Sequence, residues 1–265
     1  MLGSLHAYLT APAWALADVA DALSGVALIN SVAFASAAIP VYLLARTLVG
    51  PWSGLAAAAA AVAIPAAFYT STLMAEPLAF PLVMWAAYGS ARGLRDRSLA
   101  AAAVVGATVV LGPLVRDQLL VLPVAVGLAV ACDAVAGRDA GAWRRLLAVA
   151  VTIAAACLIA TVLIGRVNME ANVDAVTADL PGVAEAALRS LGATVAAVWV
   201  IPAVALGATW SWLRPSEDAA RRSFAATGLA FVVVFALYTG AKAEIVGGIA
   251  ELPEERNLFY LEGLA

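Results

Sequence analysis

Residues 99–135 read LAAAAVVGATVVLGPLVRDQLLVLPVAVGLAVACDAV and form an almost unbroken apolar block. As one α-helix this block would be about 55 Å long, almost twice the ~30 Å hydrocarbon core of a bilayer. A Gly-Pro pair at 112–113 and the polar trio Arg116-Asp117-Gln118 interrupt it. We therefore predict two membrane-spanning helices that are joined by a tight turn at the polar trio.

The whole chain has the same character: its 265 residues are 64% hydrophobic and 12% charged, and the mean hydropathy is +0.96. A soluble domain of average composition carries about 25% charged residues. The apolar runs lack the alternation of a membrane β-barrel, so helices are the spanning elements. We predict an all-α, multi-pass transmembrane bundle in which residues 1–265 form a single domain. The eight predicted spans are Leu23–Ala45, Ser53–Met74, Pro77–Gly93, Leu99–Val115, Gln118–Ala136, Leu146–Gly165, Ala193–Leu213 and Ser223–Ala241.

The arginines divide between alternate linkers of these runs. Ten of the fifteen basic residues fall on one set of linkers, and thirteen of the eighteen acidic residues fall on the other. Because cytoplasmic loops collect Lys and Arg, we predict that the basic linkers face the cytoplasm. The turns at Glu76 and Arg116 then lie at the outer face of the cell membrane. The basic linkers carry Arg46, Arg92, Arg95, Arg97, Arg138, Arg144, Arg145, Arg214, Arg221 and Arg222.

One of the outer segments is predicted to contain a short helix on the membrane surface. Asp179 is a helix-capping residue type, and Pro181 follows it at a position that suits the first helical turn. Glu185 and Arg189 have the i,i+4 spacing of a helical ion pair. The predicted outer segments are residues 1–22, 166–192 and 242–257.

Both ends of the chain have features of a longer protein. Residues 1–22 come before the first span on the outer face and lack the basic start of a signal peptide. Phe259–Ala265 begins a mostly apolar run of seven residues, which is too short to cross a bilayer. We therefore expect at least one helix before Met1 and more after Ala265. The alternative is a short protein with a frayed tail.

Glu76 is the first candidate for function, because ionisable side chains at membrane depth are costly. It directly precedes Pro77 and has apolar neighbours on both sides. Its carboxylate could bind a cation, orient a sugar hydroxyl or act as a base. The alternative is a structural role, in which the negative charge favours the N-terminal end of the helix dipole.

Arg116 and Arg256 are the next candidates, since both are predicted at the outer face. A guanidinium group matches the oxygens of phosphate or pyrophosphate. The alternatives are a local pair of Arg116 with Asp117 and a snorkelling interfacial role for Arg256. His6 is the only histidine, and a single histidine is more often an ordinary interfacial residue than a ligand.

Other chemistries have no signature in the sequence. Cys132 and Cys157 lie in apolar runs without metal-ligand or CxxC spacing, and we expect them to be small buried hydrophobes. No basic cluster indicates nucleic acid as a partner. No Walker loop, GxGxxG fingerprint or Ser/His/Asp triad is present.

The order of several short motifs resembles the GT-C fold glycosyltransferases that use polyprenyl-phosphate sugars, the protein O-mannosyltransferase and aminoarabinose transferase type. Leu5–Trp14 resembles the family's stretch after the first outer loop, and Ile29–Arg46 resembles its second helix. Met74–Leu78 resembles its acidic-Pro element, Leu114–Gln118 its next outer turn, and Glu255–Leu261 its Arg-Tyr-rich start of a later helix.

The resemblance implies a membrane enzyme of the cell envelope that transfers a sugar from a polyprenyl-phosphate carrier to an acceptor at the outer face. It implies Glu76 as the catalytic or acceptor-binding residue. The metal is left open, with a divalent cation as one option, and so are the sugar and the acceptor. The family's catalytic acid lies in its first outer loop, so we expect this stretch alone to be catalytically incomplete. The implied contacts to lipid phosphate and substrate are Arg116, Asp117, Arg256, Glu255 and His6.

A secondary transporter is the alternative function. Glu76 and Arg116 would then form a coupling site, and prolines in the runs would mark broken helices. No inverted repeat is found, and the polar groups fall at the predicted outer ends instead of mid-membrane. A non-catalytic scaffold is a third possibility, for which nothing specific argues. The prolines are Pro40, Pro65, Pro81, Pro113, Pro123 and Pro202.

Overall fold

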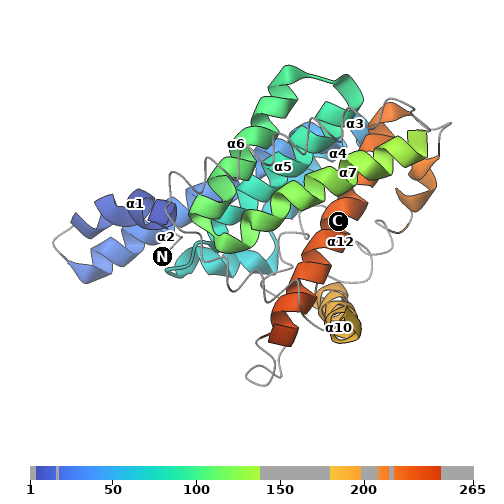
Figure 1. Cartoon of the computed structure of the whole chain (residues 1–265). Coiled ribbons are helices and arrows are strands. Elements are labelled where there is room, and N and C mark those ends of the chain that lie inside the picture. Colours follow the sequence, from blue (N-terminus) through green and yellow to red (C-terminus); the bar gives the residue numbers. More distant parts are fainter. Residues whose placement is uncertain are drawn as a thin grey trace.

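The computed structural model describes residues 4–15, 18–137, 180–197, 207, 209–214 and 218–245, and every regular element in these ranges is helical (Figure 1). The predicted all-α class is therefore confirmed for this part of the chain. The α-helices are α1 (Ser4–Thr10), α2 (Val19–Ala35), α3 (Ala38–Val49), α4 (Pro51–Val62), α5 (Glu76–Asp96), α6 (Leu99–Val115), α7 (Leu122–Gly137), α10 (Leu180–Ala197) and α12 (Ala219–Ile245). The 3-10 helices are η1 (Ala11–Ala15), η2 (Pro65–Ser71), η3 (Asp117–Val121) and η4 (Thr209–Leu213).

Three helical stretches in the described ranges are long and apolar enough to cross a membrane, namely Val19–Val49, Gln118–Gly137 and Ala219–Ala241. Each coincides with a predicted span. The helices α4 and α6 are apolar but shorter. These lengths and compositions fit a membrane protein, and the total of eight spans stays a prediction. The predicted span at 146–165 lies outside the described residues, as do residues 198–206 and 208 of the one at 193–213.

The predicted span Ser53–Met74 is not one continuous helix. Its helix α4 ends at Val62, and the chain continues as the 3-10 helix η2 from Pro65. Proline lacks the amide hydrogen that a continuing helix needs, and it pushes the preceding residue toward extended backbone. Ile64 has that extended conformation, with φ −82° and ψ 157°. The prediction of a single helix was wrong because hydropathy does not register this local constraint.

The predicted turn in the 99–135 block is confirmed. Helix α6 ends at Val115, Arg116 is extended, and η3 begins at Asp117. Gly112 permits the close return of the chain, since a Cβ atom there would lie 3.0 Å from the Cβ atom of Leu119. The α6–α7 hairpin therefore follows from local chemistry that the sequence displays.

Helix α10 begins at Leu180, as predicted, but it runs to Ala197 and so continues beyond the segment 166–192. It packs against α12, where the two helices lie close together (Figure 1). Helix α12 extends to Ile245, so the segment 242–257 begins within a helix instead of a loop. Helix α2 likewise begins at Val19, within the segment 1–22, and is capped by the Asp18 side chain.

Helix α5 lies at the centre of the packing. Thirteen of its 21 residues are buried, and it contacts α2, α3, α6, α7 and α12. A helix of 21 residues is about 32 Å long, which is close to the thickness of the hydrocarbon core. Its first residue, Glu76, and its last turn therefore mark the two opposite ends of the bundle.

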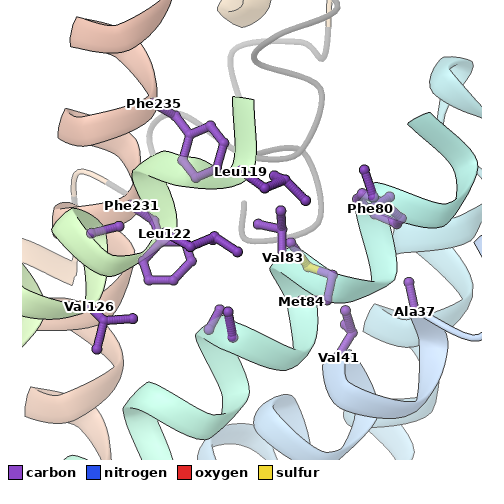
Figure 2. Close-up of a cluster of buried hydrophobic side chains, with 14 of the residues drawn as sticks. Ala37, Val41, Phe80, Val83, Met84, Leu119, Leu122, Val126, Phe231 and Phe235 are labelled. Atoms are coloured by element: carbon purple, nitrogen blue, oxygen red, sulfur yellow. The ribbon is translucent and has the colours of Figure 1, made fainter. Parts of the chain in front are cut away.

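The core is an apolar cluster that joins helices distant in sequence (Figure 2). Its side chains come from every helix from α2 to α7 and from α12. Burial of such side chains contributes roughly 25 cal/mol per Å² of apolar surface when the alternative is water. The fully or nearly fully buried members labelled in Figure 2 are Ala37, Val41, Phe80, Val83, Met84, Leu119, Leu122, Val126, Phe231 and Phe235.

Candidate functional site

The first polar feature of the bundle is an ion pair between Glu76 and Arg116. Glu76 is the first residue of α5, and Arg116 directly follows α6, so two neighbouring antiparallel helices bring the groups together. The exposed fractions of the two side chains are only 5% and 14%. A carboxylate with so little access to water needs a cationic partner, because burying an isolated charge is costly. The structure thus joins two of the residues that the sequence singled out.

A second polar group connects to this end of the bundle through Asn30. The Asn30 amide nitrogen donates a hydrogen bond of 2.9 Å to the carbonyl oxygen of Thr72, and its amide oxygen lies 3.1 Å from Nε2 of His6. Asn30 is 1% exposed. The link joins α1, α2 and the segment between η2 and α5. It places His6 and Asn30 at the same end of the bundle as Glu76.

The register between α2 and α5 supports this placement. Phe34 of α2 and Phe80 of α5 stack with their ring centroids 4.8 Å apart. Asn30 and Glu76 each stand four residues before these rings, which is about one helical turn along helices that run in the same direction. Asn30 and Glu76 therefore lie at a similar level of the bundle. We call the five residues His6, Asn30, Thr72, Glu76 and Arg116 the polar end cluster.

Sequence reasoning named three members of the polar end cluster and missed Asn30 and Thr72. Asn30 is the one amide side chain in the apolar run Leu23–Ala45, whose other small polar residues are serines, and that is the signal that could have identified it. Thr72 contributes only its backbone carbonyl, which no sequence pattern indicates. Of the other predicted contacts, Asp117 begins η3 beside Arg116. Glu255 and Arg256 lie outside the described residues.

Gln118 adds a further polar atom near Arg116 in sequence. The residue is 7% exposed, and its side-chain oxygen Oε1 has no hydrogen-bond partner among the described residues. Buried acceptors of this kind are uncommon in folded proteins. A ligand hydroxyl or amide is one kind of donor that could satisfy it.

The opposite end of α5 is basic. Arg46 of α3 and Arg92 and Arg95 of α5 line one pocket, together with the first turn of α12. Asp133 of α7 and Arg222 of α12 form a second largely buried ion pair, with Nε to Oδ1 at 3.2 Å. The arginines at the ends of α3 and α5 and at the start of α12 thus lie at one end of the bundle. The division of arginines between alternate linkers predicted this arrangement for these helices. Which side of a membrane this end faces stays a prediction.

The described part of the chain contains no group of three or more His, Cys, Asp or Glu side chains that could hold a metal ion. Glu76 is therefore not part of a ready-made metal site formed from these residues. The polar end cluster instead offers hydrogen-bond donors and acceptors around one buried ion pair. No protein family model, curated protein or solved structure matches this chain.

Proposed function

We propose that this chain is part of a membrane glycosyltransferase that takes a sugar from a polyprenyl phosphate and works at the outer face of the membrane. The observation that carries the proposal is the buried pair of Glu76 and Arg116, at the end of the bundle where the side chains of His6 and Asn30 contact each other. The order of the sequence motifs is the reason for proposing this family of enzymes. The polar end cluster is the place where we propose that the phosphate and hydroxyl groups bind.

In this proposal Arg116 contacts the lipid phosphate, because its planar donor fork suits phosphate oxygens. Glu76 is a positioning residue, since its carboxylate is engaged with that guanidinium group. The pair keeps the arginine in a fixed orientation before the donor arrives, which lowers the entropic cost of binding. We assign contacts with the sugar or the acceptor to His6 and Asn30, which lie at the same end of the bundle, and to Asp117, which directly follows Arg116 in the chain.

The transfer itself forms one bond and breaks one. The acceptor oxygen bonds to the anomeric carbon, and the bond from that carbon to the phosphate oxygen breaks. The bonding electron pair leaves with the phosphate, and the acceptor proton passes to a general base. A cationic group beside the leaving phosphate stabilises the negative charge that develops on it. Arg116 has the chemistry for this role.

Transfer of labelled sugar from polyprenyl phosphate, measured in membranes that contain the full-length enzyme and normalised to inserted protein, tests the proposal. Arg116→Lys keeps the charge and loses the fork, so we expect the KM for the lipid donor to rise roughly tenfold or more. Glu76→Gln should raise it similarly if it acts through Arg116, and the double variant should cost no more than one single variant. Near-normal transfer by both single variants would overturn the site.

Asp133→Asn is the matched control, because Asp133 is equally buried and ion-paired but lies at the other end of the bundle. It should leave the KM for the lipid donor unchanged. A loss of kcat with an unchanged KM in Glu76→Gln would instead assign Glu76 as the general base. A rise in KM for the control equal to that of Glu76→Gln would indicate a general structural effect.

The transporter alternative has one observation in its favour, the interruption of apolar helices near Pro40 and Pro65. Broken helices near the membrane centre are typical of secondary transporters. The ion pairs, however, lie at helix ends: Glu76 begins α5, and Arg222 is in the first turn of α12. Uptake of labelled sugar or ions into proteoliposomes, abolished by Glu76→Gln, would favour the transporter over the enzyme.

A further inference from the structure

The basic end of the bundle contains a pocket of about 120 Å³ between α3, α5 and the first turn of α12. Three guanidinium groups line it, from Arg46, Arg92 and Arg95. No acidic residue is among the described residues that line the pocket. We infer that this pocket binds the phosphate group of an anionic phospholipid, and this inference does not depend on the proposed glycosyl transfer.

The arginines are held in place by their neighbours. Nη1 of Arg92 donates a 2.7 Å hydrogen bond to the hydroxyl oxygen of Tyr88. Arg95 makes two hydrogen bonds to Asp96, of 2.6 and 2.7 Å, and the guanidinium carbon of Arg46 lies 5.5 Å from the centre of the Tyr42 ring. Held side chains lose less conformational freedom when an anion binds than free ones do.

Charge is in excess at this pocket. Asp96 contacts both Arg92, at 3.5 Å, and Arg95, so one carboxylate is shared between two guanidinium groups. Asp218 also interacts electrostatically with Arg95. The guanidinium groups of Arg46, Arg92 and Arg95 thus outnumber these two carboxylates, and positive charge remains in excess. An oxyanion is therefore the ligand class that the electrostatics favour. The planar donor forks of arginine match phosphate oxygens in particular.

The pocket is built like a headgroup site, with a closed floor and an open rim. Tyr88 and Ser223 at the floor are 8% and 2% exposed, whereas Arg46 and Arg92 at the rim are exposed. Leu43 and Leu44 supply an apolar wall beside Arg46. A phosphate at the rim could thus have its acyl chains against apolar helix surface, which a soluble phosphate would not use. Basic pockets between membrane helices are known sites for acidic lipid headgroups.

Binding of lipids to the purified protein tests the inference. We expect the wild-type protein in detergent to retain phosphatidylglycerol in preference to phosphatidylcholine. Each arginine near the membrane surface contributes about 1 kcal/mol to such attraction, so Arg46→Gln should weaken phosphatidylglycerol binding roughly fivefold and Arg46→Gln/Arg92→Gln by more. Arg46→Lys, which keeps the charge, should lose less than Arg46→Gln.

Arg189→Gln is the control, because Arg189 is an exposed arginine of α10 that does not line the pocket. It should bind phosphatidylglycerol like the wild type. Arg46→Gln tests the site even if Arg92→Gln, which loses the Tyr88 contact, fails to fold. Equal phosphatidylglycerol binding by the wild type and a folded Arg46→Gln variant would overturn the inference. If equimolar inorganic phosphate displaced the lipid, the pocket would be a site for free phosphate, and the inference of a lipid ligand would be overturned.

Discussion

In the described part of the chain, the two ends of this helix bundle each have a largely buried pair of a carboxylate with a guanidinium group, and they differ in what surrounds that pair. At one end, the Glu76–Arg116 pair shares the end of the bundle with the polar side chains of Asn30 and His6. At the other, Asp133 and Arg222 lie on helices whose end also gathers further arginines. The carboxylates are buried alike, with exposed side-chain fractions of 5% and 6%.

The difference shows that a buried ion pair does not by itself distinguish a functional site from a structural contact between helices. The Asp133–Arg222 pair joins the C-terminal part of α7 to the first turn of α12, and Arg46, Arg92 and Arg95 line a pocket beside that same turn of α12. Its simplest role is to align these two helices. The Glu76–Arg116 pair lies at the end of the bundle where His6, Asn30 and Thr72 form hydrogen bonds, and this end is the one to which we assign the phosphosugar in our proposal.

The largest expected effect comes from removing the arginine of each pair. Arg116→Ala leaves the Glu76 carboxylate buried without its partner, which should lower the free energy of unfolding by about 3–5 kcal/mol. Arg222→Ala should cost less, because the arginines that line the pocket beside the first turn of α12 make this end of the bundle positive. Unfolding in mixed detergent micelles measures both variants. The comparison between the ends fails if Arg222→Ala costs as much as Arg116→Ala.

Alanine substitutions at two glycines, Gly240 and Gly137, probe how tightly the helices pack at the two ends of the bundle. A Cβ atom at Gly240 would lie 2.3 Å from the carbonyl oxygen of Val183 in α10, so Gly240→Ala should displace α10 and cost about 1–3 kcal/mol. At Gly137 the nearest atom would be Nε of Arg222 at 3.7 Å, and Gly137→Ala should be nearly neutral. Unfolding free energies measure both, together with the rate of proteolysis within α10. A neutral Gly240→Ala would show that α10 is not firmly docked.

A smaller effect is expected within the polar end cluster. Asn30→Leu removes the donor to the Thr72 carbonyl and the partner of His6, which should cost about 1–3 kcal/mol of unfolding free energy. Ser31→Ala is the adjacent control on the exposed face of α2, and it should change stability by no more than about 0.5 kcal/mol. Similar costs for the two substitutions would argue against a structured polar network.

The smallest effect is a pH dependence at the basic end. The hydrogen bonds from Arg95 hold the pKa of Asp96 below its ordinary value of 3.8. A carboxyl group with a lowered pKa in the folded state adds stability above its unfolded pKa and loses it as the pH falls through the folded value. The Asp96→Asn variant should therefore lose slightly less unfolding free energy than the wild type between about pH 5 and about pH 2. An identical pH profile would show that the Asp96 contacts add nothing.

Local features of the sequence predicted several elements well. The turn before Gln118 and the helix starts at Glu76 and Leu180 follow from proline, glycine and capping residue types, which act on their immediate neighbours. The break at Pro65 follows from the same chemistry, and the run was read as continuous only because its hydropathy stays high on both sides. Residues near each other in sequence interact whatever the tertiary arrangement, so such features can be read directly.

Composition and residue pattern were enough to predict a helical chain, apolar runs that suit a bilayer, and charges divided between alternate linkers. The pairing of side chains became visible in the folded bundle: Glu76 with Arg116, Asn30 with Thr72, and Asp133 with Arg222. Hydropathy averages over all faces of a helix, whereas a contact depends on which single face turns toward which neighbour. That choice comes from side-chain packing between helices far apart in the chain, as in the contact of α12 with α5 and α7.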